Sequence, residues 1–184
     1  GLIMPTPDPR TGVLQHDIER ATPGYTLFTP LGMYKTYLIN MTGEVVHFWN
    51  LPNDVGNYAY LLENGNLLVA IRTEEGPQGL PAKGGHLMEM DWNGEIVWEH
   101  VDHAQHHDFR RCPNGNTVYL GWELLDKETQ IKVPGGMSGQ EHPDGIYADY
   151  IREIDPKGNT IWEWHAAADL DMTRFPSSKN KPLC

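Results

Sequence analysis

Cysteine is scarce in this sequence. Cys112 and Cys184 are the two among 184 residues, and no Cys-x-x-Cys spacing occurs. Two cysteines are too few for the disulfide framework of a small secreted domain, and they leave the redox compartment open. Positive charge is also scarce, with 14 Lys and Arg against 25 Asp and Glu and a net charge of −11. Because no basic stripe can neutralise phosphates, nucleic acid is not an expected partner.

Long apolar runs are missing as well. No segment approaches the roughly 20 apolar residues of a membrane span, so we expect no membrane partner. The opening residues, Gly1-Leu-Ile-Met-Pro5, lack the charged-then-apolar layout of a signal peptide. This start fits either a mature chain or a chain that never carried a signal.

Glycine, proline and aromatic residues, by contrast, are frequent. The chain has 19 Gly and 14 Pro, together with six Trp, eight Tyr and four Phe. This composition favours short strands joined by tight turns over long helices. A chain of this length can bury one sizeable core. We therefore expect an all-β protein.

Two patterns recur along the chain. One is a strand, a turn closed by glycine and a strand ending in tryptophan; its glycines are Gly43, Gly94 and Gly158, and its tryptophans are Trp49, Trp98 and Trp162. The other is a strand, Asn-Gly-Asn and a strand, with Gly65 and Gly115 lying 50 residues apart. Asn-Gly suits tight hairpins because it accepts positive φ. Interleaved, the patterns predict four antiparallel strands per unit, which is typical of a β-propeller blade.

The repeat divides the chain into three parts. Residues 1–24 form an extended lead-in, and residues 25–165 form the propeller blades. Within these, residues 25–50 supply the last three strands of one blade, while residues 57–100 and 106–165 make one blade each. Residues 166–184 are predicted to be a loop leading to a further blade. Since typical propellers have four to eight blades, we expect the remainder of the propeller as a partner, and a homo-oligomer is an alternative.

Three histidines and an aspartate lie within six positions, from His103 to Asp108. The segment begins an innermost strand, near the propeller axis. Strand alternation predicts His106 and Asp108 on one face and His107 on the other. One of the two neighbouring histidines could act as acid, base, hydrogen-bond donor or metal ligand, with its tautomer held by Asp108 or a backbone carbonyl. The alternative is a structural hydrogen-bond network between blades.

A metal site made from His103, His106 and His107 matches no dedicated motif, so no cofactor is expected. His86 and Tyr150 hold equivalent places before the third strand of their blades, where they could reach the channel mouth or play a structural role. His142 lies in the connection from 123 to 148, which we interpret as a lid or as a flexible surface excursion. The tryptophans that end the first pattern are interpreted as equivalent residues that pack between blades.

Five segments together resemble the N-terminal half of the arylsulfotransferase (aryl-sulfate sulfotransferase) propellers, and His106-His-Asp-Phe followed by Pro-Asn-Gly-Asn116 is the most specific. The others are Gly24-Tyr-Thr-Leu-Phe28, Tyr37-Leu-Ile-Asn-Met-Thr-Gly-Glu-Val-Val-His47, Leu61-Leu-Glu-Asn-Gly-Asn-Leu-Leu68, and Asp149-Tyr-Ile-Arg-Glu-Ile-Asp155 with Ile161-Trp-Glu-Trp-His165.

The resemblance implies a six-bladed propeller, of which this chain would be about half. It also implies transfer of a sulfuryl group between phenolic compounds through a sulfated histidine, without a nucleotide donor. The resemblance gives catalytic roles to His106, His107 and Asp108. The positions described above add His103, His86, Tyr150 and His142 as residues that bind the substrate, a small aromatic anion. The nucleophile is expected beyond Cys184, so the lone chain should be inactive, and a periplasmic or secreted location is favoured. A lyase or hydrolase on the same scaffold, with or without a metal, and a non-catalytic ligand-binding propeller are the alternatives.

Overall fold

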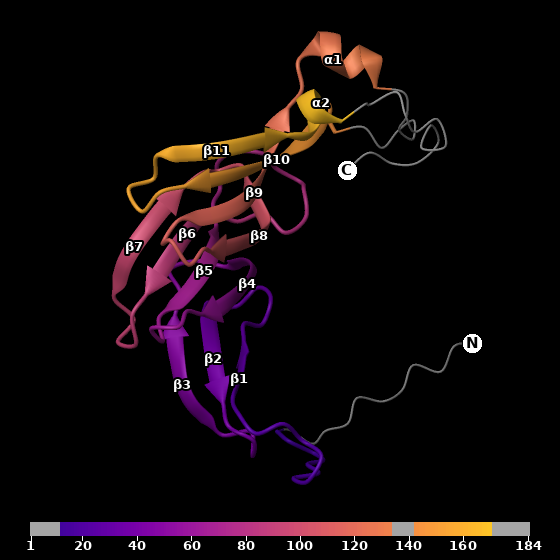
Figure 1. Ribbon diagram of the computed structural model, residues 1–184. Helices are drawn as coiled ribbons and strands as arrows, with labels where there is room; N and C mark the ends of the chain where they lie inside the picture. The colour runs from indigo at the N-terminus through magenta and orange to yellow at the C-terminus, as the bar shows by residue number, and fades with distance from the viewer. Residues whose placement is uncertain (1–11, 134–141, 171–184) are drawn as a thin grey trace, which may run out of the picture.

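The computed structural model describes residues 12–133 and 142–170, which form three antiparallel sheets (Figure 1). The first sheet contains β1 (Thr26–Phe28), β2 (Lys35–Ile39) and β3 (Val45–Asn50). The second contains β4 (Val55–Leu61), β5 (Leu67–Arg72), β6 (Gly85–Met90) and β7 (Ile96–Val101). The third contains β8 (Gln105–Arg111), β9 (Thr117–Leu124), β10 (Tyr147–Ile154) and β11 (Thr160–His165).

The prediction of an all-β chain is confirmed, with strands grouped as three, four and four. In each sheet the strands follow one another in chain order, and no sheet closes on itself. Figure 1 shows the three sheets in a curved row from the indigo to the yellow end of the chain. The first strands of the second and third sheets, β4 and β8, contact each other across the boundary between these sheets.

The Asn-Gly-Asn turns are built alike in the second and third sheets. Gly65 and Gly115 have φ of 84° and 85°, a region in which glycine carries no steric cost. In both turns the glycine N–H donates to the carbonyl three residues earlier at 2.9 Å. The last asparagine of each turn then reaches the third strand, where Asn66 donates to Glu89 and Asn116 to Glu153. The Asn-Gly-Asn residues therefore form the tight turns that the sequence predicts.

The last hairpin of each sheet contains a one-residue shift in register, between 38 and 39, 89 and 90, and 153 and 154. The paired residues align His47 with Trp98 and Trp162, and they align Trp49 with His100 and Trp164. The predicted equivalence of Trp49, Trp98 and Trp162 is therefore wrong by two residues for Trp49. The packing role holds for two of them, since Trp49 and Trp98 donate to carbonyls of the following sheet, Asp91 at 2.8 Å and Pro156 at 2.9 Å.

The core lies between the sheets, in two clusters of buried apolar residues. One joins the first and second sheets and includes Leu38, Trp49 and Val69. The other joins the second and third sheets and includes Leu68, Phe109 and Tyr119. Strand β5 is buried on both faces because each face meets a neighbouring sheet. Each fully buried Leu or Val side chain contributes about 1.5–3 kcal/mol relative to an exposed one.

Two short helices lie in segments predicted as loops. Helix α1 (Lys127–Lys132) interrupts the connection between β9 and β10, and Asp126 caps it by accepting from the Thr129 N–H at 2.7 Å. Helix α2 (Ala166–Asp169) follows β11 directly. Residues 12–24 contain no helix or strand, as predicted for the lead-in. The predicted lid residues 134–141, the rest of the lead-in and residues 171–184 with Cys184 lie outside the described residues. Neither helix in the described parts of the chain has the length and apolar character needed to cross a membrane.

Candidate functional site

The histidine segment of β8 lies at an irregularity in the sheet. His106 pairs with Leu120 and Phe109 pairs with Tyr119, so His107 and Asp108 are two extra residues on β8. His107 has φ of 48°, a left-handed conformation that is rare for a bulky side chain. Its N–H donates to the carbonyl of Ala82 at 3.0 Å, and His106 forms a bridge with Lys83. The connection between β5 and β6 thus holds this bulge from outside the sheet.

The bulge brings the two neighbouring histidines together. Their Nδ1 atoms lie 2.8 Å apart, and the ring planes are nearly perpendicular at 89°. The predicted alternation, which sent the two rings to opposite faces, is therefore wrong, because a bulge suspends the two-residue period of a strand. A hydrogen bond between two Nδ1 atoms requires that one ring donates and the other accepts.

His106 is the buried member of the pair, with 3% exposure. Its ring stacks on Trp122 of β9 with centroids 3.9 Å apart and an interplanar angle of 13°. Its Nε2 lies 3.3 Å from Oδ1 of Asp149 on β10, which is close enough for Coulombic attraction although Nε2 has no hydrogen bond of good geometry. The contact with His106 lowers the pKa of Asp149, whereas its partial burial opposes this effect. Asp149 is therefore ionised at neutral pH.

These contacts select one arrangement of protons for the neutral pair. Because the Asp149 carboxylate can only accept, His106 carries its proton on Nε2 and leaves Nδ1 as an acceptor. His107 then donates from Nδ1, so its own Nε2 holds a lone pair. His107 is exposed, and in residues 12–133 and 142–170 no group hydrogen-bonds to that nitrogen. Its pKa is lowered by partial desolvation and then by His106, while Asp149 opposes the shift. His107 thus presents a neutral imidazole to solvent.

The predicted partner Asp108 faces a different group. Its Oδ1 accepts from the Phe109 N–H at 2.8 Å and from the hydroxyl of Tyr58 on β4. Arg110 donates to the same hydroxyl and lies over the Tyr58 ring. Burial and then the Asp108 carboxylate raise the pKa of Tyr58 to about 12, so this hydroxyl stays protonated and donates. The expectation that Asp108 fixes a histidine tautomer is wrong, and Asp149 holds that place.

The remaining predicted site residues contact other groups. His103 lies 3.1 Å from Thr73 Oγ1 and 3.4 Å from Glu75, so it does not converge with His106 and His107. The other three each contact a residue outside the histidine pair: His86 lies 2.9 Å from Glu99, His142 Nε2 lies 2.7 Å from the carbonyl of Gln78, and the Tyr150 hydroxyl donates to Asp102 at 2.6 Å.

Asp102 binds the Tyr150 hydroxyl as part of a larger network. Its Oδ2 also accepts from Tyr119 at 2.8 Å and from Arg152 at 2.7 Å, and its Oδ1 accepts from the Ala104 N–H at 3.1 Å. Hydrogen bonds from the two tyrosines lower its pKa against the opposing effect of burial, which is the largest single contribution. This ion network fixes the turn that leads into β8, and so it supports the bulge from its N-terminal side.

Sequence reasoning missed Trp122 and Asp149. Trp122 on β9 and Asp149 on β10 are paired residues, and they lie on the face of the sheet that His106 covers. Tyr150 was selected from the same strand because the repeat places it level with His86, and the structure confirms that alignment. Strand alternation would have placed Asp149 on the other face, so the signal was available once the face of His106 was known.

Comparison with known proteins found no matching family model and no matching curated protein. Among solved structures, the chain is similar to a protein of unknown function from Bacteroides caccae, whose crystal structure was determined at 1.35 Å. Sequence identity is 16% and the TM-score is 0.48. The match covers 86% of this chain and 50% of that one, so the chain spans about half the length of that protein.

Proposed function

We propose that the three sheets are consecutive blades of a propeller and that the histidine pair performs acid–base chemistry in sulfuryl transfer between phenolic compounds. The repeat of strand number, turn and register supports the propeller. Burial on the third sheet also supports the propeller. Val118 and Leu120, on the face of the third sheet that lies away from the second sheet, are partly exposed. Leu68 and Ala70, at the corresponding positions of the second sheet, are buried.

The observation that carries the chemistry is the 2.8 Å contact between the two Nδ1 atoms, with Asp149 behind it. The Nε2 lone pair of His107 can accept the proton of a phenol hydroxyl as its oxygen attacks sulfur. The positive charge then spreads through the Nδ1 hydrogen bond to His106, where the Asp149 carboxylate stabilises it. In the reverse sense, the protonated His107 returns that proton to a departing phenolate.

The group that carries the sulfuryl between the two phenols is a separate part of the proposal. The resemblance places this nucleophile in the remainder of the propeller, not among the described residues. The role of His107 is therefore to move the proton, and the role of His106 and Asp149 is to set its basicity. A small aromatic anion is the substrate class that the proposed reaction implies.

The test is an assay with p-nitrophenyl sulfate as donor and a phenol as acceptor, using protein expressed from its complete gene. We expect His107→Asn to lower kcat/KM by about 10²- to 10⁴-fold, the usual range for losing a general acid–base group. Asparagine tolerates the left-handed backbone at this position, so folding should persist. His16→Gln, at an exposed histidine of the lead-in, is the matched control and should retain activity. Unchanged turnover in the double variant His106→Ala, His107→Ala would exclude the catalytic role without affecting the proposed fold.

A further inference from the structure

Strand β1 leaves one side of the first sheet open in the described residues. Thr26 pairs with Ile39 just as Leu67 pairs with Met90 and Thr117 with Ile154, so β1 corresponds to β5 and β9. In the second sheet β4 pairs with the side of β5 that faces away from β6, and in the third sheet β8 pairs with the side of β9 that faces away from β10. Beside β1 no described strand holds that place, and its backbone groups there lack strand partners.

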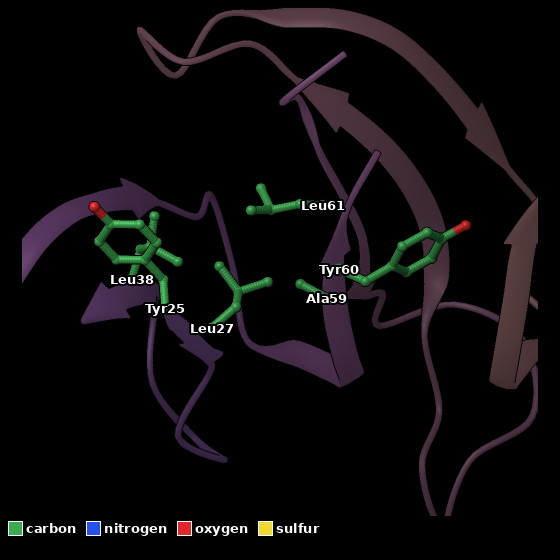
Figure 2. A pocket seen from close by; sticks show the side chains of 6 residues that line it. All are labelled: Tyr25, Leu27, Leu38, Ala59, Tyr60 and Leu61. Carbon is green, nitrogen blue, oxygen red and sulfur yellow. The ribbon is translucent and has the colours of Figure 1, made fainter. Parts of the chain in front are cut away.

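A groove runs beside β1 at the same position (Figure 2). It has a volume of about 480 Å³ and is mostly apolar. Its lining residues come from the first sheet, from the residue that precedes β1 and from β4: Tyr25, Leu27, Leu38, Ala59, Tyr60 and Leu61. Figure 2 shows Leu27 and Leu61 directed into this space, while the Tyr60 ring points away from it, towards the following sheet.

The boundary between the second and third sheets shows which side chains the repeat places in the space that corresponds to this groove. Between the second and third sheets, Tyr58 and Tyr60 of β4 fill the corresponding space and pack on Phe109, with ring centroids 5.0 and 5.8 Å apart. The Tyr60 hydroxyl also accepts from the Arg111 N–H at 2.7 Å. By the 50-residue repeat, Phe109 corresponds to Ala59 and Arg111 to Leu61.

We propose that β1 accepts a fourth, antiparallel strand from the remainder of the propeller, with large aromatic side chains on the face towards Ala59 and Leu61. Main-chain hydrogen bonds to β1 supply affinity, and the groove selects the side chains. Ala59 in place of Phe109 leaves room for a bulky ring. The proposal rests on the ring arrangement proposed above but not on sulfuryl transfer, so an inactive protein would leave it standing.

The test uses a peptide with the sequence of residues 54–63, which contains β4 and both of its tyrosines. We expect it to bind the 184-residue chain saturably and to slow hydrogen exchange of amides in Thr26–Phe28. A peptide with serine replacing both tyrosines should bind at least tenfold more weakly, because it cannot fill the groove. This comparison needs no change in the protein itself.

A pair of protein variants gives the second measurement. Leu27→Lys puts a charge into the groove and should weaken the peptide at least tenfold, whereas Val46→Lys, on the exposed far strand of the same sheet, should not. Circular dichroism checks that both variants fold. Equal binding of the serine peptide, protection of β4 or β8 in place of β1, or a dimer that already protects β1 without peptide would each overturn the proposal.

Discussion

Strands β4 and β8 hold the same place in neighbouring sheets, and each carries two extra residues at the same point of the repeat. In β4 the irregularity lies between Val55 and Ala59, and in β8 it lies between His106 and Phe109. The bulge is therefore a property of the repeated architecture. What differs is the set of side chains that each sheet places on it.

The β4 bulge is built for close packing. A Cβ on Gly56 would lie 2.6 Å from the Cα of Gly84, so no side chain fits there. In β8 the corresponding residue is His106, which extends over Trp122. Asn57 and Tyr58 then contact the other bulge, with Asn57 donating to the His107 carbonyl at 3.2 Å and Tyr58 to that of Phe109 at 3.2 Å. One bulge thus supports the other, and the histidine pair sits on the supported one.

The largest expected difference between the two bulges is in the free energy of unfolding, and it concerns the residue beneath His106. Trp122 is 8% exposed, and Arg72 at the corresponding position of β5 is exposed. We expect Trp122→Ala to lower the free energy of unfolding by about 3–5 kcal/mol, because it leaves a cavity and removes the stacked ring. Arg72→Ala should change it by less than about 0.5 kcal/mol. Urea unfolding of both variants measures the difference, and similar losses would mean that the two bulges have the same support.

The strand groups and turns could be predicted because each glycine turn is a local signal, and the structure places Gly65 and Gly115 at positive φ as expected. The pairing of His106 with His107 could not be predicted, since it depends on two extra residues that break strand alternation without any marker in the sequence.

The place of Trp49, by contrast, was readable from the sequence. Trp49 lies six residues after Gly43, whereas Trp98 and Trp162 lie four residues after Gly94 and Gly158, so a count from each glycine aligns His47 with these two tryptophans. Asp149 was missed because its side chain lies on the face that His106 covers, and the bulge on β8 hid that face from a prediction based on strand alternation. Turns and repeats can be predicted from the chain itself, whereas contacts made across a bulge depend on the assembled sheet.

A smaller effect is expected where β4 meets β8. Tyr58→Phe removes a hydroxyl that donates to Asp108 and accepts from Arg110. Because both partners are about half exposed and can turn to water, we expect a loss of about 1 kcal/mol in the free energy of unfolding. Tyr25→Phe is the control, at a side chain that is 67% exposed. If Tyr58→Phe costs no more than Tyr25→Phe, the contact between the bulges does not stabilise β8.

The smallest expected effect is electrostatic and concerns Asp149. Its charge raises the pKa of His107 against the larger lowering by desolvation and by His106, so Asp149→Asn should lower the pKa of His107 further. NMR titration of the His107 ring measures this shift, with Asp144→Asn, next to His142, as the control.

The lowered pKa of His107 also predicts how stability depends on pH, because a histidine whose pKa is lowered by folding binds its proton more readily in the unfolded chain. Stability should therefore be full above about pH 6.5 and decline as the pH falls below it. His107→Asn should reduce that decline in urea unfolding at pH 7.5 and 5.5, whereas Asn57→Ala on the β4 bulge should keep it. An equal decline in the wild type and in His107→Asn would place the titrating group elsewhere and remove the electrostatic distinction between the two bulges.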